Sequence, residues 1–331
     1  METNLRPFTL GEILDRTAQL YRSHFWLFAG IASVNSGAIL LLNLFEIGGQ
    51  EFLRAEHLLR YAILLGVFGA MLQLVVWFVV GGIAVAANNR AVAWLHLGEP
   101  ATITGAYGSI LPRTGRYVWL MVIISFMLWT PMALLYGSFL AWLFFGSRLM
   151  ARPDLRVAFL VGELLFGLLV VGCLVYALLM FLRYSLAIAS SVVENLKARQ
   201  AIRRSVELTK GARGRIFMLL LLVLVIYFGL VGITQLIFVV MAFRHGQLPV
   251  GARVTQQLVA FMTDTFIGPI YATGLTLFYY DQRVRTEGYD IEWMMQAAGL
   301  TAPPAEAAPA EDPSPTEQAA PTAQPDHAER A

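Results

Sequence analysis

Apolar residues form six long runs along this chain, each bounded by short segments that hold its polar and charged residues. The runs cover residues 25–45, 61–87, 117–146, 157–182, 216–243 and 257–280. A helix that crosses about 30 Å of hydrocarbon needs roughly 20 apolar residues. Backbone groups in lipid must also be paired within their own segment, which favours helices. The pattern therefore predicts an all-α fold: a polytopic membrane helical bundle with six transmembrane helices.

Three short segments with helical periodicity precede the first, third and fifth runs. They read "TLGEILDRTAQLYRSH" (9–24), "TITGAYGSILPRTGR" (102–116) and "NLKARQAIRRSVELTKG" (195–211). In the first, Thr9 and Glu12 have the spacing of a capping box, which starts a helix. In the third, charged residues lie opposite a weakly apolar stripe, and Gly211 suits a left-handed C-cap. We expect three in-plane amphipathic helices at the membrane surface.

The succession of amphipathic helix, span, outer loop and span occurs three times. Matches between the copies are sparse: an offset of 188 places Arg16 on Arg204 and Leu20 on Leu208. Because the matches fall at equivalent places in the pattern, we hypothesise a three-fold hairpin repeat. Hairpins that superpose no better than unrelated helix pairs would contradict it.

Composition divides the chain into two parts. The whole chain is 57% hydrophobic and only 14% charged, against about 25% charged in soluble domains. Residues 1–300 carry a net charge of +7, whereas residues 301–331 carry −5 and hold seven of the fourteen prolines. We expect a transmembrane domain over 1–300 and a disordered cytoplasmic tail over 301–331, either merely solvated or partner-binding.

The basic residues predict the orientation, since cytoplasmic loops are enriched in Lys and Arg. With the N-terminus inside, inner segments of 1–300 hold sixteen of these residues and outer loops hold seven. The loop with Arg148, Arg152 and Arg156 departs from the rule. Arginine outnumbers lysine 22 to 2, which suggests a GC-rich bacterial genome. We expect a multi-pass protein of the bacterial cytoplasmic membrane with both termini cytoplasmic.

The basic segment between the fourth and fifth spans is a candidate contact for anionic lipid headgroups or an unknown protein partner. Each cation near an anionic surface contributes about 1 kcal/mol. Glu194 and Glu207 offset part of that attraction. The candidate residues are Arg199, Arg203, Arg204, Lys210 and Arg213.

Two acids, Glu163 and Asp264, lie within predicted spans. Intramembrane carboxylates are costly and therefore candidates for function. They could line a polar cavity entered from outside, with the last span broken at Pro269 as in transporters. Alternatively, each could reach water or pair with Arg156 or Arg253.

Four amides inside the spans are expected to hydrogen-bond between helices. They are Asn35, Asn43, Gln73 and Gln235.

The residue pattern offers little for catalysis. The histidines are scattered, the single cysteine Cys173 lies in an apolar run, and no phosphate-binding glycine loop occurs. We therefore expect no catalytic residues, metal, cofactor or nucleic-acid partner.

A pair of opposite charges lies at the inner end of the last span, where Asp281 and Arg283 occur. They favour a salt-bridged helix anchor, with a lipid or partner site as the alternative.

Three motifs together resemble a known family over about residues 5–295. They are "LRPFTLGEILDRTAQLYRSHFWLFAGIA", "AIRRSVELTKG" and "LFYYDQRVRTEGYDIEWM". They resemble the membrane domain attached to membrane-anchored glycerophosphodiester phosphodiesterases, which also occurs alone in bacterial membrane proteins. The resemblance implies a multi-helix inner-membrane domain. It implies no phosphodiesterase activity, because that chemistry belongs to a barrel domain that this chain lacks.

These observations leave two functions from different classes. The first is a non-catalytic membrane module that organises lipids or partner proteins. The alternative is a small-molecule or lipid transporter with a polar cavity near Glu163 and Asp264. An intramembrane enzyme finds least support. A polar cavity that both acids line would favour transport.

Overall fold

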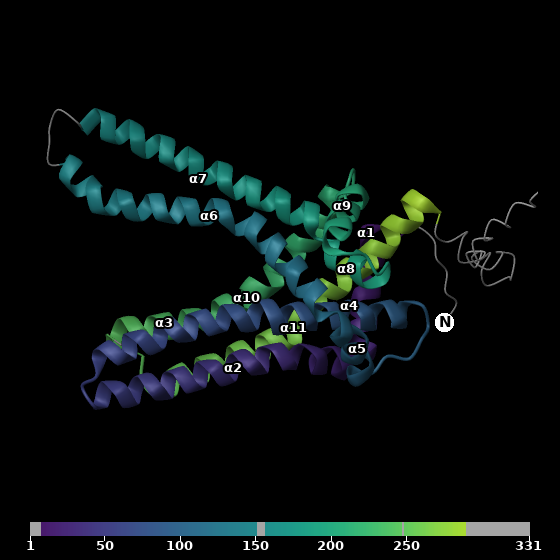
Figure 1. Ribbon diagram of the computed structural model, residues 1–331, viewed down its shortest axis with the longest axis horizontal. Coiled ribbons are helices and arrows are strands. Elements are labelled where there is room, and N and C mark those ends of the chain that lie inside the picture. Colours follow the sequence, from purple (N-terminus) through teal and green to yellow (C-terminus); the bar gives the residue numbers. More distant parts are fainter. Residues whose placement is uncertain (1–7, 151–155, 247, 289–331) are drawn as a thin grey trace, which may run out of the picture. The chain divides into compact units, whose positions relative to one another are not determined.

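The computed structural model describes residues 8–150, 156–246 and 248–288 (Figure 1). Every regular element in these residues is helical, and six helical stretches are long and apolar enough to cross a membrane. The predicted fold class is therefore confirmed: this is an all-α, multi-pass membrane protein. The predicted tail, 301–331, lies outside the described residues.

The long helices extend beyond the apolar runs that predict them. The second run, 61–87, lies within a longer helical stretch that passes through a π-helical turn and ends only at His96. The bounds are α2 Phe25–Ala55, α3 Leu59–Val76, the π-turn η1 Trp77–Gly81, α4 Gly82–His96, α6 Thr114–Met150, α7 Arg156–Tyr184, α10 Arg213–His245 and α11 Val250–Glu287.

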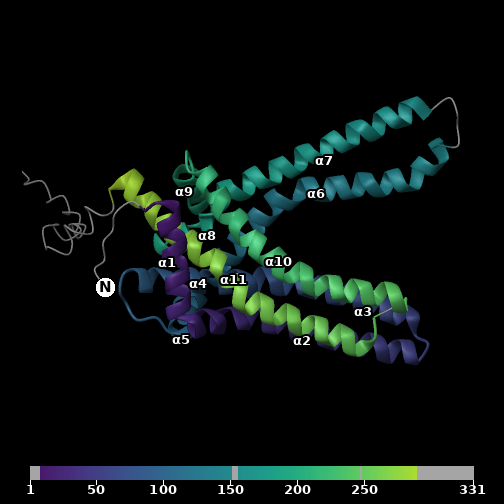
Figure 2. The same ribbon diagram turned by 180° about the vertical axis from the view of Figure 1, so that it is seen from behind.

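Short helices precede the first, third and fifth long stretches, as predicted. They are α1 Leu10–Ser23, α5 Ile103–Ile110 with the 3-10 turn η2 Leu111–Arg113, and α9 Ala198–Leu208. The capping box is present, since the Thr9 N–H donates to Glu12 Oε2 at 2.7 Å and the Glu12 N–H donates to Thr9 Oγ1 at 3.3 Å. Figure 2 shows α1 running across the long helices.

A further short helix, α8 Ala187–Val193, lies where only an inner loop was expected.

The long helices form antiparallel pairs. α2 packs against α3 and α11, α10 packs against α11, and α6 packs against α7. Both ribbon views show the α6–α7 hairpin diverging from α2, α3, α10 and α11 (Figures 1 and 2). The order short helix, long helix, long helix recurs three times; the superposition of the three hairpins stays a prediction.

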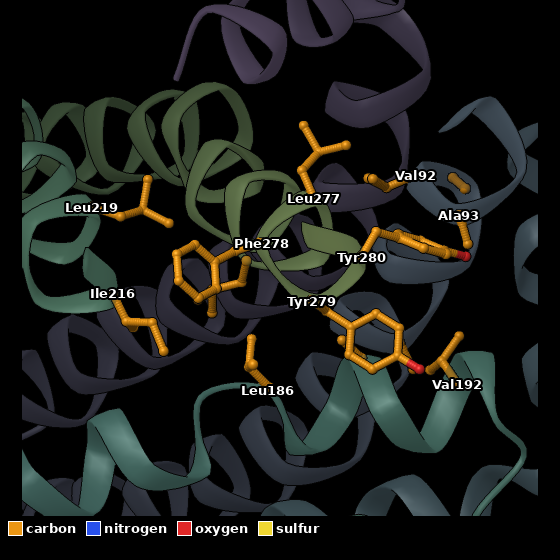
Figure 3. Close-up of a cluster of buried hydrophobic side chains, with 14 of the residues drawn as sticks. Val92, Ala93, Leu186, Val192, Ile216, Leu219, Leu277, Phe278, Tyr279 and Tyr280 are labelled. Carbon is orange, nitrogen blue, oxygen red and sulfur yellow. The ribbon is translucent and has the colours of Figure 1, made fainter. Parts of the chain in front are cut away.

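The hydrophobic core gathers around the last turns of α11. Phe278, Tyr279 and Tyr280 are each at most 1% exposed. They point in different directions from α11, so that Phe278 lies near Ile216 and Tyr280 near Val92 (Figure 3). Because three consecutive aromatic residues cover most of a helix circumference, α11 is enclosed on several sides at this end.

Candidate functional site

A partly open cavity of about 450 Å³ lies where α2, η1, α4, α6, α10 and α11 meet. Most of its wall is apolar, with a few polar groups from different helices. Its lining residues are Ile31, Ala32, Asn35, Ser36, Ile39, Trp77, Gly81, Ala84, Val85, Asn88, Met121, Tyr227, Asp264, Gly268, Pro269 and Ala272. Many of these lie nearer the predicted cytoplasmic ends of their helices, although the sequence suggested entry from outside.

Asp264 places a carboxylate in this cavity. The Tyr227 hydroxyl on α10 donates a hydrogen bond to Asp264 Oδ1 at 3.1 Å. Next to Asp264, the hydroxyls of Thr265 and Ser36 are 2.6 Å apart and join α11 to α2. The carboxylate is thus held at a packed junction of helices, with its side chain facing the cavity.

The expected break of the last span at Pro269 is wrong, because α11 continues through this residue. Proline lacks an N–H and cannot complete the helical hydrogen-bond ladder. Neighbouring groups can supply replacement bonds in membrane helices. The Tyr21 hydroxyl on α1 donates to the Phe266 carbonyl, three residues before Pro269, at 2.5 Å, and so joins α1 to this part of α11.

Two asparagines in the cavity wall have polar atoms without a hydrogen-bond partner among the described residues. Asn88 is 4% exposed, and neither its amide oxygen nor its amide nitrogen has a hydrogen-bond partner in the described part of the chain. The same holds for Asn35 Oδ1, although interhelical bonding was predicted for this residue. By contrast, Asn89 accepts a bond from Thr276 at 2.9 Å. Buried polar groups are normally paired, so the unpaired amides indicate a place for a ligand or water.

The other predicted amides join helices where the structure shows their bonds. Asn43 donates to Gln257 at 2.9 Å, and Gln235 accepts from Gln256 at 2.6 Å. These bonds connect α11 with α2 on one side and α10 on the other. Asn35 therefore differs from them by facing the cavity.

Glycines at the end of the π-turn let α2 and α6 approach closely beside the cavity. A Cβ atom on Gly81 would lie 3.3 Å from Asn35 Oδ1, and one on Gly82 would lie 3.1 Å from Met121 Cγ. A π-turn inserts an extra residue into a helix and is frequent at functional sites. Trp77 and Gly81 of this turn lie in the cavity wall.

The structure does not bring Glu163 and Asp264 together. Glu163 is exposed on α7 and is absent from the cavity lining. Arg253, a suggested partner of Asp264, instead forms an ion pair with Glu51. The side chain of Arg156, the other suggested partner, lies outside the described side chains. Only Asp264 of the two acids thus belongs to the site.

The basic segment divides into exposed and structural residues. Arg199, Arg203, Lys210 and Arg213 are exposed, and Arg203 bonds Glu207 at 3.2 Å. Arg204 differs, because its side chain is only 21% exposed and forms ion pairs with Glu194 and Glu287.

Burial opposes the charge on Arg204, but these two carboxylates outweigh burial and raise its pKa. Arg204 is therefore engaged within the chain, and its contact with lipid or a partner stays a prediction.

Asp281 and Arg283 lie in two ion-pair clusters at the end of α11. Asp281, which is 1% exposed, bonds Arg285 at 3.0 Å and Arg215 at 3.1 Å and accepts from the Phe8 N–H at 2.7 Å. Arg283 bonds Glu287 at 3.1 Å. The geometry is that of a salt-bridged anchor that ties α10, α11 and the segment before α1 together.

Sequence reasoning missed Asn88, Trp77 and Tyr227 as site residues. Asn88 lies one residue beyond the predicted second span, which was ended where the apolar run stops. The stretch "GGIAVAANN" (81–89) carries a usable signal, because small residues next to amides favour close helix packing and polar contacts in membranes. Trp77 and Tyr227 carry no such signal.

The site is equipped for hydrogen bonding. The described lining residues offer one carboxylate, two side-chain amides and two hydroxyls, and they include no Lys, Arg, His or Cys. Among the described residues, no cluster of three or more His, Cys, Asp or Glu could hold a metal ion. No protein-family model matches the chain, and neither a curated protein nor a solved structure is significantly similar to it.

Proposed function

We propose that this protein binds a small molecule or lipid in the cavity between its helices and moves it through the membrane without chemical change. The observation that carries the proposal is the buried amide of Asn88, which has no hydrogen-bond partner among the described residues and lines a cavity of about 450 Å³. Ligand sites typically measure about 300–1,000 Å³ and combine apolar walls with a few polar groups.

The unpaired amides favour ligand binding over a purely structural role. An unsatisfied buried polar group costs about 1–3 kcal/mol. A bundle that only organised neighbours would be more stable with apolar side chains at Asn35 and Asn88. A ligand that bonds these atoms would recover this free energy on binding.

The proposal is tested with two matched substitutions. Gly81→Leu fills the cavity next to Asn35, whereas Gly172→Leu on α7 adds the same side chain where no atom lies within 4 Å of the new Cβ. The purified protein is screened for thermal stabilisation by a library of metabolites and lipids. We expect compounds that stabilise the wild type and Gly172→Leu but not Gly81→Leu. The absence of such compounds, with Gly81→Leu folded, would contradict the proposal.

Movement of the ligand is measured with the same variants in liposomes. Compounds found in the screen should cross membranes that contain the wild type or Gly172→Leu, and Gly81→Leu should abolish this flux. Binding without flux would exclude transport and restrict the protein to a binding role.

A second candidate function, the organisation of anionic lipids or protein partners, is favoured by the exposed basic residues. These residues lie on α9, in the turn that follows it and at the start of α10; they are Arg199, Arg203, Lys210 and Arg213. Replacing all four with Gln should remove stabilisation by anionic lipid in nanodiscs, and salt should mimic this loss. Equal stabilisation of both proteins would exclude this candidate.

We also propose that these residues face the cytoplasm and that the membrane is the bacterial cytoplasmic membrane. Their placement follows from the distribution of basic residues. In a Cys173→Ser background, Arg199→Cys should react with a membrane-impermeant maleimide only after the cells are permeabilised. Labelling of intact cells would reverse the orientation.

The resemblance to the phosphodiesterase-associated membrane domain stays a proposal too. It is supported by the structural role of the closing motif, in which Tyr279, Tyr280 and Asp281 are buried.

A further inference from the structure

We infer that the ligand of the cavity carries a primary ammonium group on a compact apolar body. This inference rests on the proposed function and adds the chemical class of the ligand. Three observations carry it: the uncompensated carboxylate of Asp264, the free acceptor atoms around it and the nature of the walls.

Among the described residues that line the cavity, Asp264 is the only acidic or basic side chain other than a tyrosine. Among the described residues, its hydrogen-bond partner is Tyr227, which donates to Oδ1 and brings no positive charge. Arg253, the cation that follows the start of α11, is engaged with Glu51. A carboxylate that stays ionised in a low-dielectric site needs a partner of opposite charge. A cationic ligand would supply that charge, whereas an anionic ligand would add a second negative charge.

The free acceptors match the donors of an ammonium group. Asp264 Oδ2, Asn35 Oδ1 and Asn88 Oδ1 have no partner among the described residues, and they come from α11, α2 and α4. A primary ammonium carries three N–H donors and no acceptor. The lining of this one cavity thus offers as many oxygen acceptors as a primary ammonium has N–H donors.

The walls favour an organic cation over a metal ion. Trp77 and Tyr227 offer aromatic rings that attract cations. Ile39, Val85 and Met121 add apolar surface for the body of a ligand. Metal ions such as Mg²⁺ and Ca²⁺ require a close shell of about six or more oxygens, which a largely apolar cavity of about 450 Å³ does not provide.

Three probes of similar size and different charge test this inference: hexylammonium, 1-hexanol and hexanoate. Each is titrated calorimetrically at pH 7 into the full-length protein in phosphatidylcholine nanodiscs. We expect saturable binding of hexylammonium only. Asp264→Asn should weaken it at least about tenfold, as loss of a hydrogen bond between charged groups predicts. Glu163→Gln removes an exposed acid on α7 and should retain the wild-type affinity.

The outcomes separate this inference from the proposed function. If 1-hexanol or hexanoate binds as tightly as hexylammonium, and Gly81→Leu abolishes binding, the cavity is a ligand site and the ammonium assignment is wrong. If no probe binds to any protein, the ammonium assignment is also wrong, and the library screen still decides the proposed function. Should Asp264→Asn fail to fold, Asp264→Glu takes its place and should retain selectivity for the cation over 1-hexanol.

The ammonium could belong to a free amine or to a lipid headgroup. Repeating the titration in nanodiscs that contain phosphatidylethanolamine distinguishes the two sources. A headgroup ligand would compete and lower the apparent affinity for hexylammonium, whereas a free-amine site would show the same affinity in both lipids.

Discussion

Helices α11 and α7 are both long membrane spans, yet they differ in side-chain polarity and in how much of their surface is buried. α11 contains several polar residues and is the more buried of the two, with Thr265, Thr273 and Thr276 each at most 4% exposed. α7 is more apolar, and Leu160, Leu164 and Leu168 along it are each at least 61% exposed. In water the apolar helix would be the buried one. In lipid, apolar surface is already solvated, so polar contacts and close packing select which helices associate.

The interface between α2 and α11 shows how this selection works. Ser36 meets Thr265 at 2.6 Å, Asn43 meets Gln257 at 2.9 Å, and Glu51 pairs with Arg253. In these contacts the residue numbers rise along α2 as they fall along α11, as two antiparallel helices require. In α6, by contrast, the Thr130 hydroxyl donates to the Phe126 carbonyl of its own helix at 2.5 Å.

The largest difference should follow from removing one acid on each helix. Asp281→Ala on α11 leaves Arg215 and Arg285 without their buried partner and should lower the free energy of unfolding by about 3–5 kcal/mol. Glu163→Ala on α7 removes an exposed side chain and should change it by less than about 0.5 kcal/mol. Unfolding in detergent micelles, followed by circular dichroism, compares them. Equal effects would show that α11 is not anchored by Asp281.

A leucine truncation on each helix should give the next largest difference. Leu277→Ala on α11 opens a cavity at a residue 2% exposed and should cost about 2–5 kcal/mol. Leu168→Ala on α7, where the side chain is 62% exposed, should cost less than about 0.5 kcal/mol. The same unfolding measurement distinguishes them. A comparable loss at Leu168 would mean that α7 is covered by a protein surface instead of lipid.

The smallest effect is expected from the polar contact between α2 and α11. A double-mutant cycle with Ser36→Ala and Thr265→Val should give a coupling energy of about 0.6 kcal/mol and at most about 1.7 kcal/mol. As a control, Ser36→Ala combined with Thr130→Val on α6 should show additive effects, because these residues share no contact. Additivity of Ser36→Ala with Thr265→Val would remove this bond from the account of α2–α11 association.

Local sequence signals predicted local structure well. Thr9 and Glu12 form the expected capping box, and Gly211 has the expected left-handed backbone with a φ of 76°. Both depend on groups within a few residues of each other. The candidate site was predicted less well, since only Asp264 of the two proposed acids lines the cavity. Asn88 was missed because the span was ended at the last apolar residue, although the helix continues to His96.

The amino-acid sequence by itself determined that this chain crosses the membrane as helices, because run length and the cost of unpaired backbone groups in lipid depend on local composition alone. It also determined the short helices that precede alternate spans, through caps and periodicity. Only the tertiary structure decided which helices pair, that Arg204 is held by Glu194 and Glu287, and that Asp264 shares a cavity with Asn35 and Asn88. These outcomes depend on the packing of residues far apart in the chain, whose mutual orientation no local pattern specifies.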